Sequence, residues 1–189
     1  MKNFLKVFIL AAGLVLFLNV NSFANVDIAA YGGYTFSGST KIDGNKTYDG
    51  DFKGPQFGLK AHYNLSLSDS IGLGLGGFYQ YSKYKYYDFG NEKVTRNAAG
   101  VDVALFFMVS PEISPYIRVN YSFYDKIDWL FADMSGHGFG AGVGLEYAFD
   151  PSIRIFAELM YEGPTYTKYS VDVDLSATVV NVGLKYVIE

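Results

Sequence analysis

The segment 72–77, GLGLGG, fits the dinucleotide-binding pattern G-x-G-x-x-G. In a cofactor loop these glycines follow a strand and open a helix whose N-terminus binds the pyrophosphate. Residues 78–89, FYQYSKYKYYDF, come next, and no apolar stripe with helical spacing runs through them. Glycines and apolar residues instead alternate with a period of two, which is the period of a strand. The segment predicts a strand with one apolar face and one nearly bare face, and we expect no cofactor.

Two further groups of side chains have the chemistry of ligands. Asp43, Asn45, Asp49 and Asp51 supply the oxygen atoms that a divalent cation prefers, but their spacing is not that of a calcium loop. We therefore expect a solvated loop there and no metal site. His62 shares a strand face with charged residues, and we expect it to be a hydrogen-bonded structural histidine.

The N-terminus indicates export. Lys2 and Lys6 precede an apolar run over residues 7–20, and Ser22-Phe23-Ala24 offers small residues for cleavage. This pattern predicts a signal peptide over residues 1–24 and one mature domain over residues 25–189. The chain has no cysteine and a formal net charge of −4. Because Lys2 and Lys6 belong to the predicted signal peptide, the mature chain is more negative still. A nucleic-acid partner is therefore not expected.

Eight segments of the mature chain alternate apolar with small or polar residues. This alternation predicts eight strands. They cover residues 26–37, 56–65, 71–81, 99–109, 117–124, 136–149, 153–161 and 180–188. Short turns follow the second, fourth and sixth segments, and longer polar stretches follow the first, third, fifth and seventh. Such an asymmetry is typical of outer-membrane barrels, with turns in the periplasm and loops outside, and the even count places both termini in the periplasm.

Charged residues in these segments share one strand face, opposite the apolar one. Facing lipid, a Lys or Arg near the midplane would cost roughly 2–4 kcal/mol, so we expect these groups to line the lumen and to pair with one another. The predicted lumen network is Lys60, Asp102, Arg118, Glu146, Arg154, Glu158 and Lys185. A soluble ligand-binding barrel would show the reverse polarity.

The bare glycine faces follow from the same geometry. An eight-stranded barrel has an interior only wide enough for side chains to fill, so glycines on the inward face leave room for large side chains of neighbouring strands. An open solute pore is then not expected, and a small-solute channel is an alternative. Exposed aromatic residues should form a girdle at each membrane interface. The girdle residues are Tyr34, Phe36, Tyr79, Tyr81, Phe123 and Tyr161 toward the loops, and Tyr63, Tyr147, Phe149 and Tyr186 toward the turns.

These features together resemble the small outer-membrane barrels of the outer-membrane protein A transmembrane domain and outer-membrane protein X type. The resemblance covers the mature chain and implies an all-β, eight-stranded, antiparallel, up-and-down transmembrane β-barrel. The end of the chain, residues 181–188, looks like the family's C-terminal assembly signal for the barrel-assembly machinery, through Asn181, Gly183, Tyr186 and Ile188. The chain departs from that signal by ending in Glu189 instead of an aromatic residue.

The resemblance also frames the expected function. We expect a structural, surface-exposed barrel without enzymatic activity, in contact with outer-membrane lipid and lipopolysaccharide, that meets host or cell-surface ligands through its loops. The predicted contact residues are Tyr84, Tyr86, Trp129 and Phe131. Some small outer-membrane barrels modify lipid A with a His and a Ser near the outer rim. Ser135 and His137 keep that enzymatic reading open as an alternative.

Overall fold

The structure is a computed structural model and describes residues 25–42, 46–48, 52–86, 92–129, 132–168 and 171–188. The predicted signal peptide, Asp43, Asn45, Asp49, Asp51 and Glu189 lie outside these ranges. All of the regular structure within them is β-strand. The strands are β1 (Asn25–Ile42), β2 (Lys46–Tyr48), β3 (Phe52–Ser68), β4 (Ile71–Tyr86), β5 (Glu92–Phe107), β6 (Ile113–Trp129), β7 (Ala132–Ala148), β8 (Ile153–Lys168) and β9 (Val171–Ile188).

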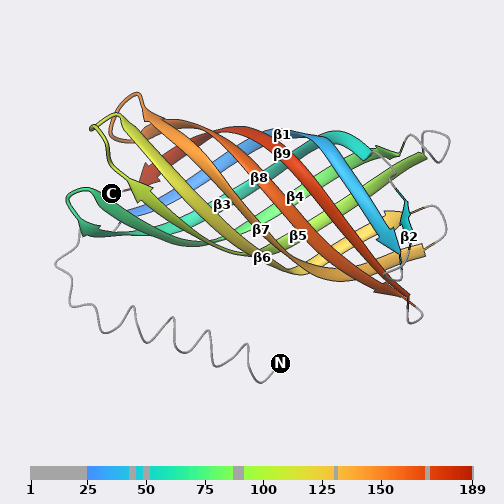
Figure 1. The fold of residues 1–189 in the computed structure, drawn as a ribbon. Coiled ribbons are helices and arrows are strands. Elements are labelled where there is room, and N and C mark those ends of the chain that lie inside the picture. Colours follow the sequence, from blue (N-terminus) through green and yellow to red (C-terminus); the bar gives the residue numbers. More distant parts are fainter. Residues whose placement is uncertain are drawn as a thin grey trace, which may run out of the picture.

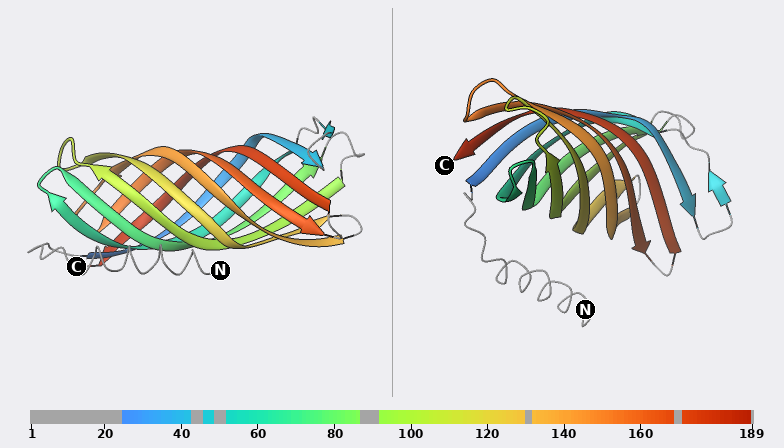
Figure 2. Two further views of the ribbon diagram at one scale, coloured as in Figure 1. Left: turned by 60° about the horizontal axis from the view of Figure 1, so that its bottom comes forward. Right: turned by 60° about the vertical axis from the view of Figure 1, so that its left-hand side comes forward.

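The eight long strands form a closed antiparallel barrel, which confirms the predicted fold class. Each strand pairs with its neighbour in the chain, and β1 pairs with β9 to close the sheet. The strands are strongly tilted relative to the barrel axis, and the described parts of both ends of the chain lie at the same end of the barrel (Figure 1). The short β2 pairs with the far end of β1 as a small hairpin outside the closed wall (Figure 2). None of the described residues forms a helix long and apolar enough to cross a membrane.

Short turns connect the strands at the end of the barrel that holds the described termini. Asp150 Oδ1 accepts hydrogen bonds from the backbone N–H groups of Ser152 and Ile153, both at 2.8 Å. Ser110 Oγ accepts a hydrogen bond of 3.1 Å from the N–H of Ile113. Asp and Ser favour turns because their side chains replace the missing backbone acceptor in this way. The sequence prediction of tight turns at this end is therefore confirmed.

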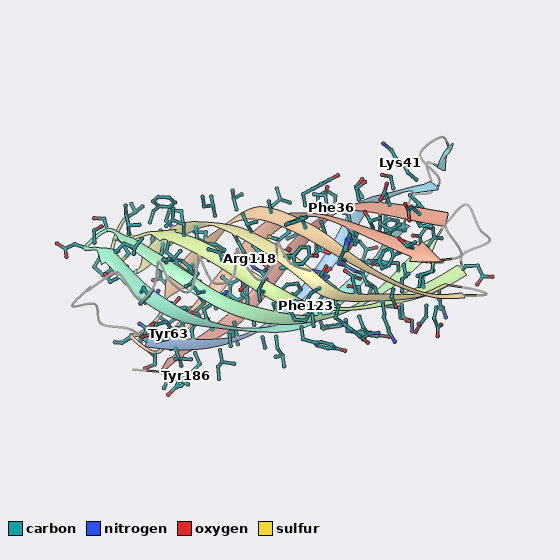
Figure 3. The ribbon with its side chains drawn as sticks, turned by 90° about the horizontal axis from the view of Figure 1, so that it is seen from below. Phe36, Lys41, Tyr63, Arg118, Phe123 and Tyr186 are labelled. Carbon is teal, nitrogen blue, oxygen red and sulfur yellow. The ribbon has the colours of Figure 1, made fainter. Side chains whose placement is uncertain are left out.

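An apolar band surrounds the outside of the barrel. Leu59, Val119 and Leu184 are more than half exposed, and large apolar side chains face outward at the middle of every long strand, which water would not favour but lipid does. The predicted girdle residues are also exposed. Figure 3 shows Tyr63 and Tyr186 near the turn end, and Phe36 and Phe123 toward the loop end, with Lys41 farther out.

The strands continue beyond the loop-side girdle. They contain 16 to 18 residues, whereas a tilted strand crosses a bilayer with about 9–11. The prediction that long polar loops follow the strands is therefore wrong in extent, because most of these stretches are strand. We call the extension the collar. It comprises residues 37–42, 52–55, 82–86, 92–97, 125–129, 132–137, 163–168 and 171–178.

The polarity of the two strand faces inverts at the start of the collar. On β4 the outward positions change from Leu75 and Tyr81 to Lys83, while the inward positions change from Gly74 to the buried Tyr84. Apolar residues also turn inward in the collar on the other long strands except β1, whose buried collar residues are Gly38 and Thr40. Water surrounds the collar where lipid surrounds the rest, so an apolar residue gains free energy only by turning inward. The collar is thus built like a small water-soluble barrel.

Candidate functional site

Inward glycines seat the large side chains that fill the lumen. The rings of Tyr31, Tyr116 and Phe156 lie over glycines of neighbouring strands, and a Cβ added to Gly58 or Gly144 would lie within 3.0 Å of a ring. Gly183 stands under Phe156 in the same way. The sequence predicted this role for the inward glycines, which leave room for large side chains of neighbouring strands.

These three rings surround the ammonium group of Lys60. Its Nζ lies 3.9 Å from the centroid of Phe156 and 5.8 Å from those of Tyr31 and Tyr116. An aromatic face attracts a desolvated cation through its quadrupole. Lys60 also forms an ion pair of 3.0 Å with Glu158. The buried cation is therefore compensated by one carboxylate and by three aromatic faces.

Glu158 is the centre of the interior network. Its Oε2 accepts hydrogen bonds from Lys60 at 3.0 Å and from the Tyr116 hydroxyl at 2.9 Å. Its Oε1 accepts from Arg118 Nη1 at 2.9 Å and from Asn181 Nδ2 at 3.0 Å. A carboxylate has about four lone-pair sites. Glu158 uses its acceptor capacity fully, as a buried charge requires.

Arg118 connects Glu158 to a second carboxylate, Asp102, at 2.6 Å. His62 lies on the other side of Asp102, with Nε2 2.8 Å from its Oδ1 and with Nδ1 3.1 Å from Asp27. All five side chains are buried. His62 therefore has two acidic neighbours and occupies the structural place that its strand face predicted.

The turn end of the lumen holds the remaining predicted charges. Glu146 pairs with Lys185, and with Arg154 at 3.5 Å, while Lys185 also lies 3.3 Å from Asp27. A cavity of about 90 Å³ opens beside these groups and is lined partly by Asn64. The structure thus places the seven predicted charges on the inner face, six of them buried and Arg154 31% exposed at the turn end, and each forms an ion pair with another of the seven.

A second ionic cluster lies at the base of the collar, and the sequence did not predict it. Arg96 forms an ion pair of 2.7 Å with Asp125 and another with Glu162. The Gln80 side chain donates hydrogen bonds to Gln56 at 3.1 Å and to Glu162 at 3.3 Å. Asp125 follows the predicted fifth strand and Arg96 precedes the predicted fourth, so the sequence predicted no inward position for either residue.

An apolar cluster fills the interior beyond this second ionic cluster. Its members are at most 7% exposed, and Phe52 packs on Tyr84 and Tyr86 with ring centroids 4.8 and 5.1 Å apart. We call this group the upper apolar cluster. It consists of Phe52, Tyr84, Tyr86, Val94, Ile127, Met134, Met160, Tyr166, Val173, Leu175, Ala177 and Val179.

The prediction that Tyr84 and Tyr86 offer exposed contact area is wrong. Their side chains are 1% and 0% exposed, because the collar turns its apolar residues inward. Burial raises the pKa of both phenols, and also that of Tyr166, above the usual range. Trp129 ends β6 but its side chain is not among those described, and Phe131 lies outside the described residues.

The enzymatic alternative gains little from the geometry. Ser135 and His137 occupy successive outward positions of β7 in the collar, and both are exposed. The His137 ring lies 6.2 Å from that of Tyr121, and Thr165 stands opposite it on β8. Within the described ranges, no group of three or more acidic or histidine side chains is arranged to hold a metal ion.

The predicted assembly signal forms the second half of β9. Tyr186 and Ile188 point outward and are about half exposed, whereas Asn181 is buried and donates to Glu158. Gly183 lies between Ala30 and the Phe156 ring, with no space for a side chain. Asn181 and Gly183 therefore have a packing role in the folded barrel, independent of any role in recognition by the assembly machinery.

Comparisons with known proteins agree with this architecture. The sequence matches the family of the outer membrane protein beta-barrel domain over residues 9–187. The structure is similar to the N-terminal β-barrel domain of Pseudomonas aeruginosa OprF, with a TM-score of 0.56 and 17% identity over 89% of this chain and 100% of that one. It is also similar to Neisserial surface protein A (NspA), with a TM-score of 0.58 and 18% identity over 86% and 97% of the two chains.

A search of the curated proteins finds no match. At these identities the two structural likenesses show the fold alone, whereas the family match covers most of the sequence. The chain therefore belongs to the outer membrane protein β-barrel family and is a protein of the bacterial outer membrane.

Proposed function

We propose that this protein is a non-conducting, non-enzymatic barrel that carries a rigid collar above the outer membrane and presents it for contact with cell-surface ligands. Its turns and both ends of the mature chain lie in the periplasm, and its loops lie outside. The observation that carries the proposal is the filled interior, in which two ionic clusters are followed by the upper apolar cluster.

Closure of the lumen follows from the energetics of this filling. A solute path would have to separate Arg118 from Asp102 and Glu158, which leaves buried charges without partners. It would then have to cross closely packed side chains such as Tyr86 and Val94, which are 0% exposed. Neither barrier opens at low cost.

The collar suits contact because it is folded in advance. Its strands are hydrogen-bonded to their neighbours, for example Thr95 beside Asp128 and Ser39 beside Ser176 on its outward face. A preorganised surface loses little conformational entropy when it binds. The contacting groups are then the polar outward residues and the loops, while the inward tyrosines support them.

Two measurements test this proposal. Planar-bilayer recording with the purified protein is expected to give no steady conductance steps, and large, steady steps would contradict the closed lumen. Cells that display the protein are expected to bind host matrix or neighbouring cells, and to lose that binding when the residues between β4 and β5 are replaced by a short Gly-Ser linker. Unchanged binding, with the barrel still inserted, would leave a role in envelope integrity alone.

A further inference from the structure

The outward face of the collar carries charges of opposite sign in two sectors. In the first, Lys53 of β3, Lys83 of β4 and Lys93 of β5 lie on three consecutive strands, and the last two are exposed. The other described outward side chains of the collar on β3 and β5 are uncharged. We call Lys53, Lys83 and Lys93 the basic sector. Its positive charge favours a partner surface that carries carboxylates.

The second sector is acidic. Asp128 of β6, Asp133 of β7 and Asp174 of β9 are exposed, and no lysine or arginine is among the described outward collar side chains of β7, β8 and β9. Asp128 stands directly opposite Asp133, and like charges in this position repel. Lys41 of β1 stands opposite Asp174, but within the described ranges it forms no ion pair. We call Asp128, Asp133 and Asp174 the acidic sector.

The two sectors lie on opposite sides of the barrel. The closed sheet runs from β1 through β3, β4, β5, β6, β7, β8 and β9 back to β1, so β8 is the strand diametrically opposite β4. The basic sector is centred on β4, and the strands of the acidic sector flank β8. The collar therefore has a positive side and a negative side across its diameter.

The sectors also lie at similar heights above the membrane. Lys83 is the first outward residue of β4 beyond the girdle residue Tyr81. Asp174 stands opposite Thr165, which is the second outward residue of β8 beyond the girdle residue Tyr161. One outward step is about 7 Å along a tilted strand. A long lysine side chain covers this difference, so the ammonium groups of one sector can reach the level of the carboxylates of the other.

The membrane makes this arrangement self-complementary. All copies of a barrel insert in the same direction, so two copies side by side present their collars at the same height. When β4 of one copy faces β8 of the next, β3 faces β9 and β5 faces β7. Lys53 of the first copy then meets Asp174 of the second, and Lys93 meets Asp133. Two basic or two acidic sectors placed together would repel instead.

We infer that the collar binds a second copy of this chain through contact between the basic sector of one copy and the acidic sector of the next. Because the two contacting surfaces differ, the contact repeats from copy to copy and produces rows in the plane of the membrane instead of closed pairs. The inference requires a common direction of insertion, but neither the closed lumen nor a cell-surface ligand.

Cross-linking in isolated outer membranes tests this contact, because the chain has no cysteine of its own. One copy of the full mature protein carries Thr95→Cys, two residues from Lys93 on β5. A second copy with a different affinity tag carries Ser135→Cys, two residues from Asp133 on β7. A short bismaleimide joins the two thiols, and the cross-linked dimer is quantified on gels. We expect several times more dimer when both copies share a membrane than when either is alone.

Charge reversal separates the two sectors from general crowding. Lys53→Glu, Lys83→Glu and Lys93→Glu in the Thr95→Cys copy should lower the yield of mixed dimer at least about tenfold, because each exposed ion pair contributes up to about fivefold and is replaced by a repulsion. Adding Asp128→Lys, Asp133→Lys and Asp174→Lys to the Ser135→Cys copy should restore the yield. Lys41→Glu in the Thr95→Cys copy is the matched control and should change the yield by less than about twofold.

Heat-dependent gel mobility shows whether each variant is a folded barrel, so that a lost cross-link is not mistaken for lost folding. Equal cross-linking in mixed and single-variant membranes would overturn the inference. So would a cross-link that survives the first charge reversal, or one that the complementary reversal does not restore, because crowding of barrels in the membrane would then account for the contact.

Discussion

Replacing Glu158 by Ala perturbs the centre of the lumen network. The substitution removes the ion-pair partner of Lys60, one of the two carboxylates beside Arg118, and the acceptor of Tyr116 and Asn181. The Glu158 side chain is 0% exposed and that of Lys60 is 2% exposed, so water does not replace the lost contacts without entering the barrel.

The expected magnitude follows from these contacts. Breaking a buried ion pair by removing one partner costs about 3–5 kcal/mol, because the other charge stays buried. Arg118 keeps Asp102 and adds little to this sum. Tyr116 and Asn181 each lose an acceptor, at about 1–3 kcal/mol for an unsatisfied buried group. We therefore expect Glu158→Ala to lower the free energy of unfolding by at least about 5 kcal/mol.

Urea unfolding in lipid vesicles measures this loss, followed by fluorescence of the single tryptophan and by heat-dependent gel mobility. Glu112→Ala, in an exposed turn, is the matched control and should change the free energy by less than about 0.5 kcal/mol. Adding Lys60→Met to a Glu158→Leu variant removes both charges and should recover most of the loss. A loss below about 1 kcal/mol for Glu158→Ala, or no recovery in the double variant, would refute the assignment of Glu158 as the centre of the network.

Three other predictions follow from the packing, the lipid face and the collar. Gly144→Ala pushes a Cβ into the Tyr116 ring and should cost about 1–3 kcal/mol in the same unfolding assay, whereas Gly32→Ala, with 3.7 Å to its nearest neighbour, should cost under about 1 kcal/mol; equal costs would contradict the seating of rings on glycines. Val119→Arg on the lipid face should cost roughly 2–4 kcal/mol, and Ser135→Arg in the collar close to nothing, so equal costs would contradict the position of the band. Burial raises the pKa of Tyr86, so the folded collar keeps this phenol neutral, whereas the phenol in an unfolded collar ionises near pH 10. The collar should therefore lose stability as the pH rises above about 10, which protease cleavage measures. Tyr86→Phe should reduce that loss.

The barrel could be predicted because its alternation is dictated by lipid and lumen together. Adjacent residues such as Lys60 and Leu59 lie on opposite faces of the strand. Because lipid surrounds the outside of a closed barrel, the charged face must line the interior. The same parity predicted the interior location of Arg118 and Glu158. Which charges pair could not be predicted, because partners come from strands far apart in the sequence.

The alternation that continues past Tyr81 indicates that β4 extends beyond the girdle, but the inversion of its two faces in the collar was not predicted. Beyond Tyr81 the alternation continues with its polarity reversed, so Tyr84 looked exposed although it is buried. On β6 a bulge adds a second obstacle. Phe123 and Tyr124 are both exposed, and the inward face resumes at Asp125 with the opposite parity. The two adjacent aromatic residues, followed by an alternation of opposite parity, were the sequence signal that Asp125 points inward.

The inverted faces of the collar can be measured directly, because the chain contains no cysteine. Single cysteines at Leu75, Lys83 and Tyr84 on β4 can carry a spin label in lipid nanodiscs, with collision rates measured for a lipid-soluble and a water-soluble relaxation agent. We predict that the label at Leu75 meets the lipid-soluble agent, that the label at Lys83 meets the water-soluble one, and that the label at Tyr84 is shielded from both. A label at Lys83 that meets the lipid-soluble agent, together with one at Tyr84 that is open to water, would contradict the account.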